Sequence, residues 1–279
     1  MTAAAPDLTA SQFRRLADII HRDSGIVIND AKKSLLIARI NRRLRALNIA
    51  DYGAYCARLE GPGARDERRE LLSAITTNVT AFFRENHHFD ALSRDVLPGL
   101  AERARSGHRI RLWSAACSSG EEPYSMAMTM LEAFPDAGKH DILILATDID
   151  PQMVTRAEEG CYDDDSTKFL GPARVQRFLT RHGRSRLMSH EVKALLRFGE
   201  LNLHAEWPFS GMFDVIMCRN VAIYFDSETR RRLWLRFASV LPPGAMLFIG
   251  HSERIDGPAA ALFDLVGTTA YRRNSTPSA

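Results

Sequence analysis

The sequence contains few cysteines, and they are too far apart to form the usual metal-binding pairs. Structural zinc sites and redox centres commonly use C-x-x-C pairs, and this chain has none. We therefore expect no bound metal and four free thiols, as is usual in a reducing compartment. The four residues are Cys56, Cys117, Cys161 and Cys218.

Long hydrophobic runs are also missing. No apolar stretch is long enough to cross a membrane as a helix. The opening "MTAAAPDLTASQ" lacks the basic start and the apolar stretch of a secretory signal peptide. With 279 residues, 45% of them hydrophobic, the chain is predicted to be a cytoplasmic globular protein of one or two domains.

The sequence has no phosphate-binding signature in its strand–loop–helix stretch, where a nucleotide-binding protein would carry one. The stretch "RLWSAACSSGEEPYSMAM" at 111–128 reads as a strand, a loop of small residues and a helix. It contains neither the P-loop pattern nor the glycines of a dinucleotide-binding loop. Glu121 and Glu122 open the helix, where two carboxylates would repel the phosphate that a helix N-terminus otherwise attracts. The loop therefore suits a ligand without phosphates.

Charge is distributed unevenly along the chain. Residues 1–75 hold 13 Lys and Arg against 9 Asp and Glu, whereas the remainder holds 24 against 25. The basic excess in the first third of the chain indicates an acidic partner there.

Hydrophobic periodicity divides the chain into two parts. The first 75 residues follow helical spacing, including a helix 11–24 that Ser11 would cap and Gly25 would end. From about residue 85, apolar strands alternate with helices that start near Glu121, Pro151 and Ser227. This alternation predicts an α/β domain with a mostly parallel sheet covered on both faces. The strand candidates are "RIRLWSA", "ILILATDID", "FDVIMCRN" and "GAMLFIGHS", with final strands in "FDLVGTTAYRR".

Polar residues follow these strands at the edge where ligands bind in open α/β sheets. Asp148 ends the second strand, 28 residues after Gly120, and its carboxylate can accept from both ribose hydroxyls; Asp150 is expected to cap the next helix. Asn220 follows the third strand and can read an adenine or an amino-acid group, although a plain turn residue is as good an explanation. His251 and Glu253 follow the fourth strand.

S-adenosylmethionine has the properties that this edge requires. It has a ribose, an ammonium group and a sulfonium, and it has no phosphate. A carboxylate at the helix start would balance the ammonium group. The missing glycines and the acidic helix start weaken the alternative of a nicotinamide dinucleotide.

Five motifs, in order, strongly resemble the CheR family of chemotaxis methyltransferases, which esterify glutamates on chemoreceptors. The motifs are "ITTNVTAFFRENHHF", "WSAACSSGEEPYSMA", "ATDIDPQMV", "CRNVAIYFD" and "LFIGHSE". The resemblance implies a small N-terminal helical bundle followed by a Rossmann-like methyltransferase domain with a small antiparallel β insertion.

The resemblance also implies roles for individual residues. It places a linker at the cofactor, assigns the ammonium contact to Glu122 over Glu121, and puts Tyr224 near the transferred methyl group. For Glu121, its position at the helix start favours the simpler role of stabilising the helix dipole. The cofactor residues that it implies, together with Ala116 of the small-residue loop, are Asn78, Thr80, Arg84, Ala116, Glu122, Asp148, Asn202, Leu203, Arg219 and Asn220.

The expected reaction needs no general base. A glutamate substrate with a reference pKa near 4.3 is already ionised at neutral pH, so alignment in a shielded site should supply most of the rate. We expect Arg84 to hold the incoming carboxylate and Tyr224 to shape the methyl slot, as the two catalytic residues. Arg84 as a surface cation and Tyr224 as a packing residue are the alternatives.

A basic helix is the expected docking surface for the protein substrate. The segment 31–47 has six basic residues and no acid, and Lys32, Arg39 and Arg43 share one helix face. With Arg42 they would bind acidic helices in the cytoplasmic domain of chemoreceptors, at membrane-embedded receptor arrays. A solvated basic helix is the alternative.

The expected boundaries are 1–76 for the helical domain, 77–88 for the linker and 89–279 for the methyltransferase domain, with the antiparallel insertion at about 183–200. The insertion is short, with Gly183 near its start, so we expect no tethering by a receptor C-terminal pentapeptide. A monomer that binds no nucleic acid and releases S-adenosylhomocysteine is expected. Methyl transfer to another protein or to RNA remains the alternative function.

Overall fold

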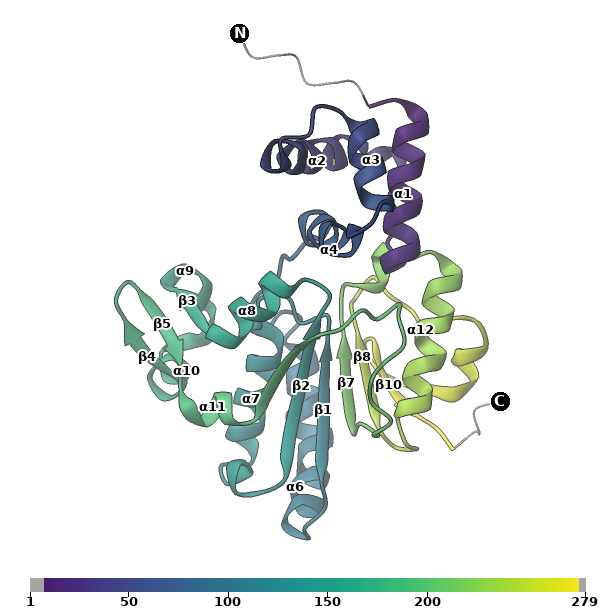
Figure 1. The fold of residues 1–279 in the computed structure, drawn as a ribbon. Coiled ribbons are helices and arrows are strands. Elements are labelled where there is room, and N and C mark those ends of the chain that lie inside the picture. The colour runs from purple at the N-terminus through teal and green to yellow at the C-terminus, as the bar shows by residue number, and fades with distance from the viewer. Residues whose placement is uncertain (1–7, 276–279) are drawn as a thin grey trace. The chain divides into compact units, whose positions relative to one another are not determined.

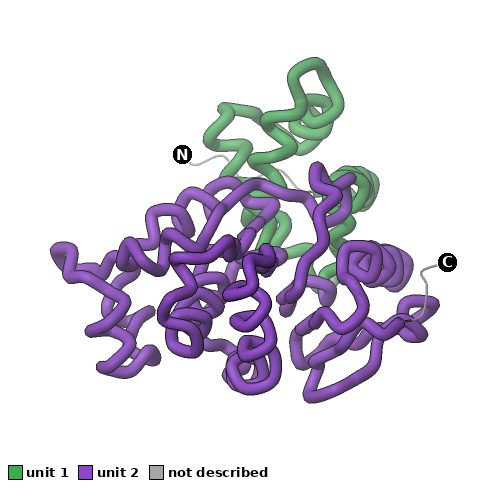
Figure 2. The backbone as a smooth tube through the Cα atoms, turned by 90° about the horizontal axis from the view of Figure 1, so that it is seen from below, with its two compact units in different colours: residues 1–77, 224–226 green, residues 78–223, 227–279 purple. Residues whose placement is uncertain are grey.

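The computed structural model describes residues 8–275 and shows two compact units. The smaller unit contains residues 1–77 together with 224–226, and the larger one contains 78–223 and 227–279 (Figure 2). The first seven residues, part of the stretch in which no signal peptide is expected, lie outside the described range. No helix in residues 8–275 has the length and apolar character needed to span a membrane.

The smaller unit is helical, as the sequence predicts (Figure 1). Thr9 and Gln12 cap the first helix reciprocally, so the prediction of Ser11 as the cap is wrong. The left-handed Gly25, with φ 75°, ends it as expected. The helices are α1 (Ala10–Ser24), the 3-10 turn η1 (Asp30–Lys32), α2 (Lys33–Leu47), α3 (Tyr52–Glu60) and α4 (Ala64–Ile75).

The larger unit is built on a seven-stranded sheet. In spatial order its strands are β6 (Leu196–Glu200), β2 (Ile142–Asp148), β1 (Ile110–Ala115), β7 (Val215–Cys218), β8 (Met246–Ile249), β10 (Ala270–Arg273) and β9 (Phe263–Gly267). The first five run parallel, and β10 pairs antiparallel with both β8 and β9. The predicted α/β architecture is confirmed.

Helices cover both faces of this sheet. Leu112 of β1 belongs to the same buried cluster as residues of α6 and α7. Its neighbour Trp113 packs against Phe237 of α12, with 5.5 Å between the centres of their rings. Because successive strand residues point to opposite faces, these helices lie on opposite sides. The helices and turns are α5 (His87–Ala91), the π-helical turn η2 (Leu92–Val96), α6 (Leu97–Arg105), α7 (Glu121–Ala133), η3 (Ala137–Lys139), α8 (Pro151–Glu159), η5 (Ala222–Tyr224), α12 (Ser227–Val240) and η6 (Gly257–Leu262).

A small three-stranded antiparallel sheet is inserted after α8, in the order β3, β5, β4. The expected insertion at 183–200 is therefore only partly right, since Ser185–Met188 belongs to it but Leu196–Glu200 pairs parallel with β2 in the main sheet. The elements of this region are β3 (Cys161–Asp163), α9 (Asp164–Thr167), η4 (Lys168–Leu170), α10 (Gly171–Phe178), β4 (Leu179–His182), β5 (Ser185–Met188) and α11 (His190–Ala194).

Candidate active site

The loop between β1 and α7 has an unusual backbone. Ala116, Ser118 and Gly120 all have positive φ, at 68°, 50° and 100°. A residue with a Cβ pays roughly 1–2 kcal/mol for this conformation, so the loop must be held in place. A Cβ on Gly120 would lie 2.8 Å from Tyr162 Oη and 2.9 Å from the Ala157 Cβ, which leaves room only for glycine.

Asp148, at the end of β2, holds this loop. Its Oδ2 accepts from Ser118 N at 2.8 Å and its Oδ1 from Asp150 N at 2.9 Å. Burial raises the pKa of Asp148 to about 6, against the opposing effect of these backbone N–H groups. Each carboxylate oxygen can still accept a second hydrogen bond, which suits the two hydroxyls of a ribose.

The linker residue Asn78 joins the same group. Its Nδ2 donates to Asp150 Oδ2 at 2.9 Å, and its carbonyl oxygen accepts from Ser118 Oγ at 3.0 Å. Asp150 also caps α8 by accepting from Gln152 N at 3.0 Å, as predicted. The structure thus brings Asn78 and Asp148 together, and Thr80 lies half-buried two residues beyond Asn78.

Glu122 and Arg219 form a buried ion pair beneath the loop. Glu122 Oε1 accepts from Ser114 Oγ at 2.7 Å, and Oε2 lies 3.2 Å from Arg219 Nη1. Burial raises the pKa of Glu122, while the charge of Arg219 lowers it. Glu121 has a different partner. Its carboxylate accepts from Ser119 Oγ at 2.7 Å.

Several polar atoms around Arg219 have no hydrogen-bond partner. The Arg219 side chain is only 2% exposed and lies 3.6 Å from Glu85 Oε2. Among the described residues, Arg219 Nε, Glu85 Oε2 and His88 Nδ1 are all buried without a hydrogen-bond partner, although Glu85 Oε2 lies 3.6 Å from both His88 Nδ1 and Arg219 Nη2. Buried polar atoms are usually satisfied, so these mark a place where a further polar group belongs. Two carboxylates around one guanidinium leave a net negative charge, which fits the ammonium and sulfonium groups of S-adenosylmethionine.

The segment after β6 also meets Asp148. Leu201 N donates to the backbone oxygen of Asp148 at 2.9 Å. Asn202 Oδ1 accepts from His204 N at 2.9 Å, and Leu203 is buried. The predicted adenine residues Asn202 and Leu203 thus directly follow Leu201, which is hydrogen-bonded to the backbone of Asp148.

Glu85 escaped the sequence analysis. Its Oε1 accepts from His251 Nδ1 at 3.0 Å and from Asn220 Nδ2 at 3.3 Å. Burial raises the pKa of Glu85, but the His251 hydrogen bond and the charge of Arg219 outweigh it and bring the pKa to about 2. Its position next to Arg84 in the linker motif could have indicated from the sequence that Glu85 lies near the site.

The two predicted catalytic residues lie in different units. Arg84 is half-buried, and its Nη1 donates to Val79 O at 3.0 Å. Its guanidinium forms no ion pair within residues 8–275, while its carbonyl oxygen accepts from Arg219. Tyr224 belongs to the smaller unit, where its carbonyl oxygen accepts from Val27 N at 2.8 Å and Lys32 Nζ lies 4.9 Å from the centre of its ring.

Two of the four predicted docking residues are engaged inside the smaller unit. Arg39 donates to the carbonyl oxygens of Ala74 and Thr76. Arg43 donates to Glu67 at 2.6 and 3.0 Å and to Glu70 at 3.0 Å. These contacts hold α2 against α4.

Arg42 and Lys32 complete the predicted docking set. Arg42 is exposed and forms no ion pair in the described part of the chain. Lys32 is half-buried against Tyr224. Arg42 is therefore the member of the set that is best able to meet a partner.

One cluster could hold a metal ion by its ligand types. Glu85, His87 and His88 each offer one ligand atom, and these atoms lie within 4.8 Å of one another. Burial and the charge of Arg219 lower the pKa of His88 to about 4, which leaves the imidazole neutral. However, Glu85 is already engaged, because its Oε2 lies 3.6 Å from Arg219 Nη2 and its Oε1 accepts from His251 Nδ1 at 3.0 Å. We assign no metal to this cluster.

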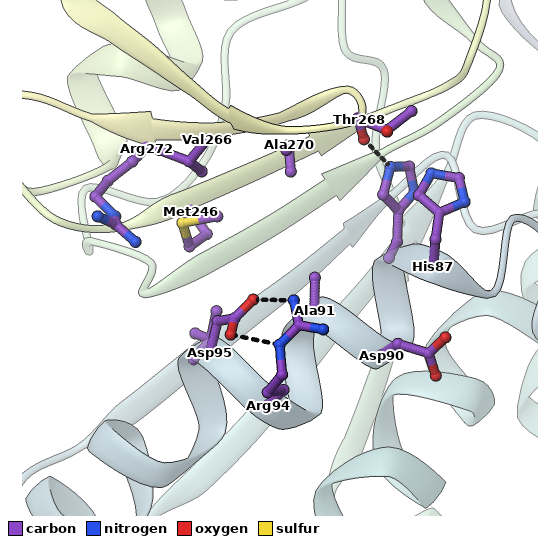
Figure 3. Close-up of a pocket in the computed structure, with 13 residues that line it drawn as sticks. His87, Asp90, Ala91, Arg94, Asp95, Met246, Val266, Thr268, Ala270 and Arg272 are labelled. Atoms are coloured by element: carbon purple, nitrogen blue, oxygen red, sulfur yellow. Dashed lines mark hydrogen bonds and ion pairs between the residues drawn. The ribbon is translucent and has the colours of Figure 1, made fainter.

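His87 and His88 also line a surface groove of about 770 Å³ beside β9 and β10. Figure 3 shows Arg94 and Asp95 paired within it, by hydrogen bonds of 2.8 and 2.7 Å. None of the predicted cofactor residues lines this groove. It shares only His88 with the group of polar side chains around Arg219.

The fold and the site together define an S-adenosylmethionine-dependent methyltransferase. At the edge of a doubly covered sheet where ligands bind in this class of fold, Asp148 ends β2 and the Glu122–Arg219 ion pair lies buried next to the loop after β1. Residues 78–272 match the family model of the CheR methyltransferase, SAM binding domain, and residues 11–76 match that of the CheR methyltransferase, all-alpha domain. The chain belongs to the CheR methyltransferase family.

Similar curated proteins cover most of the chain. A probable chemotaxis protein methyltransferase of Rhizobium etli is 47% identical over 258 residues, which is 91% of this chain and 96% of that protein. The chemotaxis protein methyltransferase of Klebsiella aerogenes is 41% identical, covering 95% of this chain and 90% of the relative. That of Escherichia coli is 38% identical, with coverage of 95% and 91%.

Proposed function

We propose that this methyltransferase esterifies glutamate side chains in the cytoplasmic helical domain of chemoreceptors. The names of its relatives, which are chemotaxis protein methyltransferases, support this substrate. The observation that carries the proposal is the buried group of Glu122, Arg219 and Glu85 below the loop after β1, because its net negative charge suits a cationic cofactor. The products are a glutamyl methyl ester and S-adenosylhomocysteine.

The cofactor contacts divide between the linker and the strand ends. Asp148 accepts from the ribose hydroxyls, and Glu122 receives the ammonium group. Arg219 and Asn220 face the methionine part, while Asn202 and Leu203 face the adenine. Asn78, Thr80 and Ala116 complete the cofactor contacts, and Asn78 is itself fixed by Asp150.

S-adenosylmethionine supplies an electrophilic methyl group at its sulfonium. The chain then has to bring an ionised carboxylate into line with it and exclude water. Arg84 suits the orienting role, because its guanidinium is partly exposed and forms no ion pair within residues 8–275. Tyr224 shapes the methyl slot. No side chain has to remove a proton, because the substrate carboxylate carries none at neutral pH.

The partner contact is assigned to the basic helix α2. Arg42 would contact receptor carboxylates directly. Arg39 and Arg43 would hold α2 in place through their hydrogen bonds to α4 and to the residue that follows it. The hairpin turn at Gly183 is short, in agreement with docking that does not depend on a receptor C-terminal pentapeptide. The enzyme acts as a monomer at receptor arrays on the cytoplasmic side of the membrane.

Methyl transfer from labelled cofactor to receptor-containing membranes tests the proposal. Label that alkali releases as volatile methanol identifies a carboxyl ester. Alkali-stable label, or label in an RNA fraction, would instead support the alternative of another methylated protein or RNA. Membranes that lack chemoreceptors are the matched control and should remain unlabelled.

A further inference from the structure

Glu253 is a buried carboxylate that the proposed reaction does not use. It follows β8 and is 6% exposed. Its Oε2 accepts from Gly250 N at 2.6 Å and from Asn220 N at 3.1 Å, and its Oε1 accepts from Ile223 N at 3.3 Å. Three backbone N–H groups from two separate loops therefore converge on one side chain.

These contacts join the loops that follow two neighbouring parallel strands, β7 and β8. Asn220 has a φ of 60°, a conformation that is unfavourable for a residue with a Cβ and persists only when its surroundings impose it. The hydrogen bond from Asn220 N to Glu253 is one such constraint. Arg219, the preceding residue, carries the guanidinium that pairs with Glu122.

Asn220 is enclosed from two further sides. A Cβ on Gly250 would lie 2.6 Å from Asn220 Nδ2, 2.7 Å from Asn220 N and 2.9 Å from Glu253 Oε2. Glu85 accepts from Asn220 Nδ2 at 3.3 Å. Glu253 thus binds the backbone of Asn220, and Glu85 binds its side chain. Gly250 leaves the space that Asn220 occupies, because it has no Cβ.

Asp214, a buried carboxylate at the start of β7, the strand that Asn220 follows, offers a comparison. Asp214 directly precedes β7, accepts from Arg111 N at 2.9 Å and pairs with Arg103 at 2.5 Å. It is buried like Glu253, but none of these contacts involves a proposed cofactor residue. Both side chains are buried carboxylates, but only Glu253 is hydrogen-bonded to a proposed cofactor residue, Asn220.

We propose that Glu253 is a positioning residue, whose carboxylate fixes Arg219 and Asn220 in the conformation that binds the cofactor. It acts through those two residues and touches neither cofactor nor substrate. This inference rests on the proposed cofactor role of Arg219 and Asn220.

The test compares E253Q with D214N in the full chain, by titration calorimetry with S-adenosylhomocysteine and by thermal unfolding. In E253Q an amide nitrogen replaces one accepting oxygen, so we expect the dissociation constant to rise about tenfold or more, the effect of one or two lost hydrogen bonds. D214N should unfold at a lower temperature but keep its affinity within about twofold.

Wild-type affinity in E253Q, combined with a fall in unfolding temperature like that of D214N, would overturn the inference and leave Glu253 a structural residue. Equal loss of affinity in D214N would overturn it as well. If E253Q does not fold, G250A is the second variant, because its added Cβ would lie 2.7 Å from Asn220 N and 2.9 Å from Glu253 Oε2 and so separate the two. It should weaken binding by a similar factor, and wild-type affinity in G250A would count against the inference.

N220A separates this inference from the function on which it rests. If N220A weakens binding and E253Q does not, only the role of Glu253 fails. If N220A also binds S-adenosylhomocysteine normally, the assignment of Asn220 to the cofactor site fails first.

Discussion

Each unit of this protein places one arginine between two glutamates, and the two networks differ in how completely their polar atoms are paired. In the smaller unit, Arg43 donates to Glu67 and Glu70 at 2.6 to 3.0 Å, and Glu67 also accepts from Tyr55 Oη at 2.7 Å. In the larger unit, Arg219 lies 3.2 Å from Glu122 and 3.6 Å from Glu85.

The difference separates a structural network from a binding site. All three nitrogens of the Arg43 guanidinium have partners. Arg219 Nε and Glu85 Oε2 have no hydrogen-bond partner among residues 8–275, although both are buried. An incompletely paired buried network costs stability, and a bound polar ligand can recover that cost. The same residue types thus stabilise one unit and prepare the other for a ligand.

Removing the arginine of the structural network should have the largest effect. R43A leaves Glu67, which is 4% exposed, without its charge partner, and breaking a buried pair in this way costs about 3–5 kcal/mol. Denaturant unfolding should show this loss, while the folded protein binds S-adenosylhomocysteine normally. A loss below about 1 kcal/mol would mean that this pair is no stronger than an ordinary surface pair.

Neutralising one glutamate in each network sharpens the contrast. E122Q should weaken S-adenosylhomocysteine binding about 10- to 100-fold, the value of a charge-assisted hydrogen bond, without lowering the unfolding temperature, because burial already disfavours the charge of Glu122. The matched variant E67Q should lose stability and keep its affinity. The contrast would be wrong if E122Q lost stability and kept its affinity while E67Q lost affinity and kept its stability.

The raised pKa of Asp148 predicts a pH dependence that belongs to the larger unit. The ionised carboxylate accepts from the ribose hydroxyls, and protonation removes acceptors, so affinity should fall as the pH drops through about 6. Between pH 7 and pH 5 the dissociation constant of S-adenosylhomocysteine should rise about tenfold. Calorimetry on D148N provides the control, in which binding is weak and nearly independent of pH over this range.

Reversing one exposed charge of the smaller unit should have the smallest effect. R42E is expected to raise the Michaelis constant for receptor severalfold at low salt and less at high salt. Its stability should stay within about 0.5 kcal/mol of wild type. R58E, at an exposed position on α3, is the charge-matched control, and an equal effect there would point to net charge and away from a docking face.

The sequence predicted the parts of the fold that depend on local pattern. The strands that end at Ala115 and Asp148 and the helix starts at Glu121 and Pro151 agree with the structure, because apolar runs and helix caps are encoded by adjacent residues. Leu196–Glu200 was placed in the wrong sheet, since the parallel partner of a short strand does not follow from its own residues.

Within the site, the sequence singled out Asp148 and both helix-start glutamates but gave no role to Glu85 or Glu253. These two reach Asn220 across 135 and 33 residues. Their contacts depend on backbone conformations with positive φ at Glu85 and Asn220, which the identities of these residues do not reveal. The internal use of Arg39 and Arg43 was missed for a similar reason, because a helical pattern shows which residues share a face but not which neighbouring helix covers it.

The membership of residues 224–226 in the smaller unit limits how the chain can be divided. Ile26 forms a β-bridge with Phe225, which is buried, and His21 pairs with Asp226 at 2.6 Å. The two family matches, at 11–76 and 78–272, suggest a simple cut near residue 77. A chain trimmed there would lose the bridge between Ile26 and Phe225 and the pairing of His21 with Asp226. A chimera that exchanged only the N-terminal segment would have to re-form those contacts with foreign residues. The two units are therefore not interchangeable modules, because three residues of the later sequence would have to travel with the earlier part.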